Sequence, residues 1–373
     1  MPPPTSLYIH VPFRSDHRPY DDAAYDVVSP PARRTYVSAL QTELRTYAVP
    51  RLSQTRVASV HFGGGRPSLL SLNDLRRLRD VLAPVLDENT EFAVEISPAD
   101  ATESYVKGLS SLGVTRLCVE GVSLSPATLR AVGSSHTADD VDHALSMARR
   151  FEFDTVGLDL LFGTESLSLD TWDATLRDAV SAGWPHISII ESPTASPDAN
   201  ATAAQMERAL SLLTGAGYAH YSLTHFARPG HQPTHQTHYD QHASYLGVGP
   251  SAASFWRSPS APNTHALRWS NVSALSDYAD RLAQGKAPFS EKEVLGPQAL
   301  AREHLIIRLQ TADGLKIAHL RETYGLDLQS SASALLARLR AHKLVADVPG
   351  WVRLTPKGRL RTDAITNRLL ASL

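Results

Sequence analysis

The sequence contains a single cysteine, Cys118, among 373 residues. An internal disulfide is therefore excluded, and so is any centre that needs several thiolates from one chain. Long apolar runs are also missing, since no stretch approaches the roughly 20 residues that a membrane-spanning helix needs. The start, MPPPTS, has none of the features of a signal or transit peptide. These absences predict a cytoplasmic protein without a membrane span.

An excess of charge of either sign is likewise absent. The chain has 36 Lys and Arg against 38 Asp and Glu, which gives a formal net charge of −2 at pH 7. A general affinity for polyanions is therefore not expected. The apolar content of 42% and charged content of 20% are those of a globular protein. The length suits two or three domains with a large core.

Short runs of β-type residues recur along the first half of the chain, each followed by a helical pattern. These runs are Leu7–Val11, Val57–Phe62, Phe92–Ile96, Arg116–Val122, Thr155–Phe162 and His186–Glu191. Their spacing suits βα units of a parallel sheet. Six units are too few for a closed eight-stranded barrel, so the sequence predicts an α/β fold with a partial (β/α)6 barrel. Ligands of such barrels lie at the C-terminal ends of the strands.

The pattern changes to compact amphipathic helices over residues 289–373. Helices are expected at Pro297–Leu309, Lys316–Tyr324 and Ser331–His342, and a hairpin at Leu344–Val348 and Trp351–Leu354. Three helices and a hairpin predict a winged-helix-like domain. Its basic residues are diluted by acidic ones, so we expect packing or partner docking rather than binding of nucleic acid.

Several segments together identify a family. They are HVPFRSDHRPYDD from His10, FGGGRPS from Phe62, GLDLLFG from Gly157, GYAHY from Gly217 and FARPGH from Phe226. Over nearly the whole chain they resemble the radical S-adenosylmethionine (SAM) branch that holds oxygen-independent coproporphyrinogen III oxidase and the haem chaperone HemW. The resemblance implies a radical-SAM-type partial barrel over residues 1–225. It also implies a Gly/His-rich extension and connector over 226–288, and a HemW-type C-terminal domain over 289–373.

The loop after the first strand carries three cysteines in that branch. Their thiolates hold a [4Fe–4S] cluster, and its fourth iron binds SAM. The resemblance places these positions at Arg14, Arg18 and Asp21. A protonated guanidinium has no lone pair to offer to iron, so we expect no cluster, no other metal and no catalytic residue in this loop.

Other positions that contact SAM or the cluster in the branch are kept. The resemblance places them at Tyr8, Tyr20, Gly64, Gly65, Glu95 and Asp159. A glutamine that follows the fourth strand in the branch is missing after Val122, and an arginine is replaced by Ser134. The resemblance thus implies a vestigial SAM pocket with weak binding. The alternative is that the kept residues serve turns and ion pairs.

Three arginines stand where the branch has uncharged residues or thiolates, namely Arg14, Arg18 and Arg66. Arginine suits bidentate binding of carboxylates. One interpretation is that these arginines bind the propionates of a tetrapyrrole. The other is that they fill the vacated space and pair with internal acids such as Asp21, Glu95 and Asp159.

Six histidines lie between His220 and His242. The HemW pattern HNxxYW, implicated there in haem binding, aligns with residues 235–240. This alignment keeps His235 and Tyr239 and adds His238. Histidine and tyrosine can both be axial haem ligands, so these three residues are candidate iron ligands. An exposed polar loop without such a role is the alternative.

The leading interpretation is a HemW-like protein that binds haem or a related tetrapyrrole, passes it to an acceptor protein and performs no radical chemistry. One alternative is a SAM-dependent oxidoreductase similar to coproporphyrinogen III oxidase. Another is a pseudoenzyme scaffold without a cofactor. The sequence does not predict the oligomeric state.

Overall fold

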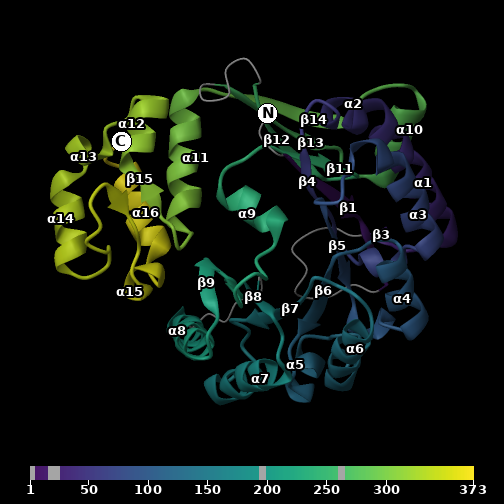
Figure 1. Cartoon of the computed structure of the whole chain (residues 1–373), viewed down its shortest axis with the longest axis horizontal. Coiled ribbons are helices and arrows are strands. Elements are labelled where there is room, and N and C mark those ends of the chain that lie inside the picture. The colour runs from purple at the N-terminus through teal and green to yellow at the C-terminus, as the bar shows by residue number, and fades with distance from the viewer. Residues whose placement is uncertain (1–4, 16–25, 193–198, 259–264) are drawn as a thin grey trace.

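The computed structural model describes residues 5–15, 26–192, 199–258 and 265–373. Its main feature is a twelve-stranded sheet in the order β14-β13-β12-β11-β1-β4-β5-β6-β7-β8-β10-β9 (Figure 1). No helix among the described residues is long and apolar enough to cross a bilayer.

Six consecutive parallel strands form the centre of the sheet. They are β1 (Thr5–Val11), β4 (Val57–Gly64), β5 (Glu91–Ile96), β6 (Arg116–Val122), β7 (Thr155–Phe162) and β8 (His186–Glu191). The helices between and after them are α1 (Pro30–Glu43), α2 (Val49–Leu52), α3 (Leu72–Leu82), α4 (Glu103–Ser111), α5 (Pro126–Ala131), α6 (Ala138–Arg150), α7 (Leu169–Ala182) and α8 (Ala199–Gly215). Each of the six predicted runs falls in one of these strands, so the expected α/β fold is confirmed.

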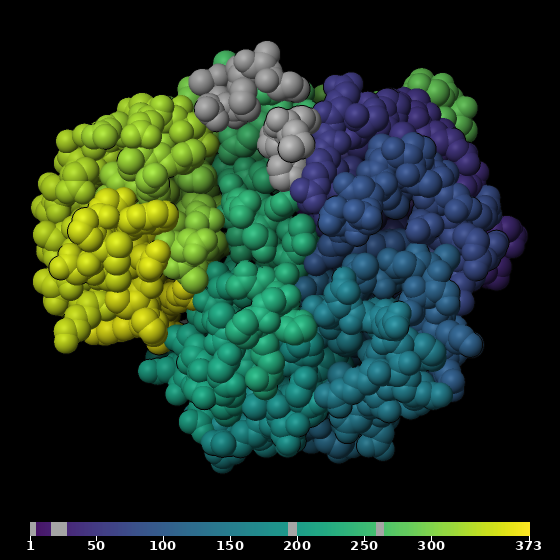
Figure 2. Space-filling view, in the orientation of Figure 1, coloured from purple at the N-terminus to yellow at the C-terminus, as the bar shows by residue number. Residues whose placement is uncertain are grey.

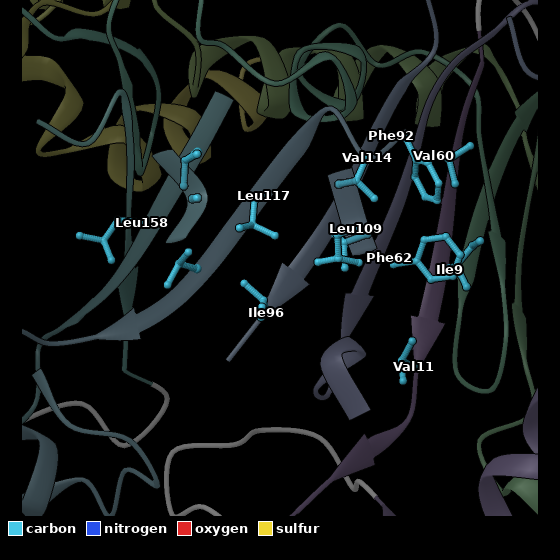
Figure 3. Close-up of a cluster of buried hydrophobic side chains, with 14 of the residues drawn as sticks. Ile9, Val11, Val60, Phe62, Phe92, Ile96, Leu109, Val114, Leu117 and Leu158 are labelled. Atoms are coloured by element: carbon cyan, nitrogen blue, oxygen red, sulfur yellow. The ribbon is translucent and has the colours of Figure 1, made fainter. Parts of the chain in front are cut away.

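Alternation along the strands gives the sheet two different faces. One face is apolar and fully buried under the helices, as Ile9, Val60, Leu117 and Leu158 show together with Leu109 of α4 (Figure 3). The opposite face, here called the inner face, carries mostly polar side chains that stay partly exposed. Its residues are Tyr8, His10, His61, Glu95, Cys118, Glu120 and Asp159.

Further strands extend the sheet at both edges. Beside β1 lies the parallel strand β11 (Tyr245–Val248), followed by the antiparallel strands β12 (Ala253–Arg257), β13 (Ala266–Asn271) and β14 (Phe289–Leu295). The other edge carries β10 (His225–Ala227) and β9 (Ala219–Ser222). The domain division at 225–226 and 288–289 stays a prediction; the sheet runs across both positions.

A buried carboxylate joins α1 to this extension. Glu43 accepts hydrogen bonds from the Gly249 amide (2.8 Å), Asn271 Nδ2 (2.7 Å) and the hydroxyl of Tyr278 (2.5 Å) in α10 (Leu275–Ala283). Burial raises the pKa of Glu43 to about 7 in spite of these three donors. The extension is thus fixed to the barrel through a polar contact inside the protein.

The C-terminal residues form their own lobe (Figure 2) with a separate apolar core that includes Leu305, Leu320 and Leu336. Its helices are α11 (Pro297–Leu309), α12 (Ile317–Tyr324), α13 (Leu328–Ser331), α14 (Ser333–Ala341), α15 (Pro356–Arg359) and α16 (Thr362–Leu370). The three predicted helices are present.

The predicted hairpin of this lobe is present in a reduced form. Val345 and Leu354 form a single antiparallel bridge, and Gly350 has the positive φ of 77° that the turn requires. The strand that forms is β16 (Trp351–Val352), and it pairs with β15 (Leu315–Lys316) instead of with residues 344–348. Leu315 and Val352 are both fully buried, so their contact with the core selects this pairing.

Candidate ligand site

Hydrogen bonds connect the polar side chains of the inner face. His61 Nε2 lies 2.8 Å from Glu95 Oε1, and the Tyr8 hydroxyl lies 3.4 Å from His10 Nδ1. Burial and the nearby charge of Glu95 raise the pKa of Asp159 to about 7. Burial disfavours the charged carboxylate and the charge of Glu95 opposes a second one nearby, so Asp159 titrates near neutral pH instead of in the usual acidic range.

Arg14 lies at the C-terminal mouth of the barrel, in the short strand β2 (Phe13–Arg14) that pairs with β3 (Asp26–Val27). Its Nη1 donates to Glu120 Oε1 (3.1 Å) and Oε2 (3.3 Å), and its side chain is only 8% exposed. The guanidinium at the position that the resemblance gives to the first cluster cysteine is thus bound to a carboxylate of β6. Tyr20 and the other two cluster positions, Arg18 and Asp21, lie outside the described residues.

Arg66 follows β4 and is buried in a second ion pair at the same mouth. Its Nε and Nη2 donate to the two carboxylate oxygens of Asp100, both at 2.7 Å, and its Nη1 donates to Ser15 Oγ at 2.6 Å. Ser68 also donates to Asp100. Sequence reasoning missed Glu120 and Asp100 as partners. The sequence signal that could have indicated them is their position, because Glu120 lies within β6 and Asp100 shortly after β5.

Removal of the Asp100 carboxylate should destabilise the protein strongly. Asp100→Ala leaves the Arg66 guanidinium buried without its bidentate partner, a change that typically costs about 3–5 kcal/mol. Urea unfolding should show this loss. Glu103→Ala is the matched control, because Glu103 also binds an arginine, Arg150, through both oxygens, but on the surface. It should cost no more than about 1 kcal/mol. Equal losses in the two variants would refute the buried-pair assignment.

The glycines after β4 have a packing role that needs no ligand. A Cβ on Gly65 would lie 2.2 Å from the carbonyl oxygen of Phe13, and Gly64 has a φ of 105°. The Gly65 amide donates to the Val11 carbonyl at 2.8 Å. Close approach of β1 and β4 at the mouth therefore requires glycine at both positions.

Helix α9 (Thr234–Asp240) carries the candidate iron ligands and packs against the opposite ends of β1 and β4. His238 Nδ1 lies 3.2 Å from Ser6 Oγ, and His235 Nδ1 lies 3.3 Å from Ser59 Oγ. Ser59 Oγ donates to Ser6 Oγ at 2.8 Å. The two histidines are thus linked by two serine hydroxyls into one hydrogen-bonded chain.

The direction of the bond between the two serines constrains the tautomer of His235. The one proton of the Ser59 hydroxyl is donated to Ser6, so His235 must donate to Ser59 from Nδ1. The proton of the Ser6 hydroxyl remains available for donation to His238 Nδ1. His235 is left with a lone pair on Nε2, and His238 carries its proton on Nε2 when Ser6 is its donor. No described residue forms a hydrogen bond with either Nε2.

Electrostatics keep His235 neutral. Burial, aided by the nearby His61 and His238, lowers the pKa of His235 to about 3. The ring lies 5.2 Å from that of His61 and 6.0 Å from that of Tyr8. Tyr239 is placed differently, with 46% of its surface exposed and its ring 5.6 Å from that of Tyr245. His235 is therefore a neutral imidazole at physiological pH, the form that can ligate iron.

The candidate iron ligands and the arginines lie at opposite ends of the same strands. Arg14 stands eight residues after Ser6, and Arg66 seven residues after Ser59. At about 3.3 Å per residue the two sets are separated by roughly 20 Å. The candidate iron ligands thus contact residues near the start of β1 and β4, whereas both arginines follow the ends of these strands. The structure brings together His235 and His238, but not these histidines and the arginines.

Comparisons with known proteins agree with this architecture. Coproporphyrinogen III oxidase (HemN) from Escherichia coli, described as a radical SAM enzyme, has the same fold with a TM-score of 0.84 at 20% identity. That match covers 100% of this chain and 91% of the other. The protein is therefore of the radical SAM fold class.

Sequence relatives define the family more narrowly. The heme chaperone HemW of Mycobacterium tuberculosis is 29% identical over 98% of this chain and 95% of the relative. The heme chaperone HemW of Bacillus subtilis is 26% identical over 99% of this chain and 100% of the relative. Residues 295–361 match the family model of the HemN C-terminal domain. The chain is thus similar over nearly its whole length to HemW of two bacteria, and its C-terminal part matches the HemN C-terminal domain.

Proposed function

We propose that the protein binds haem through His235 and carries it without radical chemistry. The observation that supports this function best is the hydrogen-bonded chain on α9, which holds His235 by Nδ1 and leaves Nε2 with a lone pair and no partner among the described residues. A histidine fixed in this way is preorganised for iron, because the bond at one nitrogen sets the tautomer and orientation of the ring. We take haem as the ligand because the relatives are named as heme chaperones.

The residues at the mouth do not fit a [4Fe–4S] cluster. Such a cluster needs several thiolates, and the one cysteine of the chain, Cys118, lies within β6, where burial raises the pKa of its thiol. Arg14 instead brings a guanidinium to the first cluster position and binds Glu120. Among the described residues no group of three or more His, Cys, Asp or Glu side chains is arranged to hold a metal ion. These features favour a carrier over an oxidoreductase that depends on SAM.

The protein would supply a neutral imidazole ligand and hold its ring in a fixed orientation. With a pKa of about 3, His235 stays unprotonated over the whole physiological range. Haem would bring an iron to which the imidazole of His235 would bind. We expect the carrier to act in the cytoplasm and to deliver its haem to an acceptor protein.

A haem titration of the purified protein tests this function. We expect saturable binding and a sharp absorbance band typical of iron ligated by a histidine. The same titration of the protein unfolded in urea, at equal concentration, gives the non-specific background. A spectrum of the folded protein that matches this background would refute haem carriage.

A further inference from the structure

A groove of about 680 Å³ lies between α2 and one face of strands β12, β13 and β14, which Figure 1 shows beside each other. It is separate from α9 and from the mouth of the barrel. Its main lining residues are Tyr47, Arg51, Trp256, Leu267, Phe289 and Val294. The volume is within the range of about 300–1,000 Å³ that small-molecule sites occupy.

Strand register explains why the groove is apolar and flat. Trp256 is paired with Leu267, and Leu267 with Val294, so these three side chains form one row across the sheet. Trp269 and Lys292 form the next row on the same face. Leu267 and Val294 are 41% and 68% exposed. An apolar row of this kind, open to solvent, is typical of a binding surface.

Arg51 supplies a cation to the groove. Its guanidinium lies 5.5 Å from the ring centre of Trp256 and 5.1 Å from that of Trp269. No described residue forms an ion pair or a side-chain hydrogen bond with it, although burial lowers its pKa. Lys292 lies nearby, with its Nζ 4.6 Å from the ring centre of Phe289.

Acidic side chains are absent from the described residues on the groove face of these strands. Of the described residues that line the groove, none is acidic. Glu291 and Glu293 alternate with Lys292 along β14 and so point to the other face, where Glu293 lies 3.6 Å from Arg268. The strands thus separate charge: acids and their arginine on one face, cations with aromatic rings on the other.

We propose that the groove binds a flat, largely apolar ring system that carries a carboxylate at its rim. The ring would lie on the row of Trp256, Leu267 and Val294, because aromatic and aliphatic side chains stack on flat ligands. The carboxylate would pair with Arg51, whose planar N–H groups match two oxygens. The proposal does not depend on haem ligation by His235.

Metal-free protoporphyrin IX is a suitable probe, since it has the flat ring and two carboxylates but no iron for a histidine. Its binding to the full-length protein can be followed by the absorbance of the porphyrin and quenching of tryptophan fluorescence. We expect saturable binding that is at least about tenfold weaker for the dimethyl ester, which keeps the ring and lacks the charge. ATP, an anion with a smaller and more polar ring, should not compete.

Two variants locate the site. Arg51→Gln and Val294→Asp should each weaken protoporphyrin binding by about tenfold or more; the second is at an exposed position, so folding is not at risk. Arg130→Gln on α5 and Glu291→Ala on the opposite face of β14 are matched controls and should bind as the wild type does. Wild-type affinity in both groove variants, equal binding of acid and ester, or competition by ATP would overturn the proposal.

Discussion

Replacement of His235 with alanine should reduce binding of iron-ligated haem by at least about tenfold, whereas His238→Ala should reduce it by less than about threefold. The difference follows from the direction in which the Ser59 hydroxyl donates its proton. Ser59 donates to Ser6, which leaves a lone pair on Nε2 of His235, and we infer that Ser6 in turn donates to His238 and so leaves its proton on Nε2. Only the former can ligate iron without a tautomer change. Haem titrations of the two variants, read at the band of ligated iron, measure the difference.

Two further variants test the hydrogen bonds that link His235 and His238 through the two serines. Ser59→Ala keeps the His235 ring but removes the acceptor of its Nδ1 proton, so haem binding should fall by an intermediate factor. His143→Ala on the exposed side of α6 is the control for loss of a surface histidine and should bind haem as the wild type does. Equal losses for His235→Ala and His238→Ala would contradict the assigned tautomers, and no loss in either would remove α9 from the haem site.

The wild-type protein should acquire no [4Fe–4S] cluster on anaerobic treatment with iron and sulfide, and the triple variant Arg14→Cys/Arg18→Cys/Asp21→Cys should acquire one. The variant places thiolates at the three positions that the resemblance gives to the cluster cysteines, and thiolates are what such a cluster requires. It also removes the guanidinium that Glu120 binds at the mouth. Iron and sulfide analysis should give about four of each per variant chain.

The triple alanine variant at the same three positions is the matched control. It removes the same charges and supplies no thiolate, so it should stay without a cluster as the wild type does. A broad visible shoulder that bleaches on reduction, with a stoichiometric iron content in the wild type, would contradict the cluster-free assignment. Cys118 is present in all three proteins and so does not explain a difference between them.

Local sequence determined much of the fold. Runs such as Val57–Phe62 and Thr155–Phe162 are rich in β-branched and apolar residues, and each became a buried parallel strand, β4 and β7. Pro297 at the start of α11 fixed a helix boundary, because a missing N–H costs nothing there. The single cysteine excluded a set of thiolates whatever the fold. These features depend on neighbours within a few residues and on composition.

Other features were decided only by the tertiary structure. Sequence alone placed Arg66 and His235 in one candidate haem site, but packing of α9 at the first residues of β1 and β4 puts them at opposite ends of the barrel. The partner of Arg66 is Asp100, 34 residues away, and the groove cation Arg51 meets Trp256 and Trp269 from a strand pair more than 200 residues later. Periodicity tells which face of an element is apolar, but not which distant element packs against it. That choice depends on the shape of the whole core, because close packing must bury every apolar face at once.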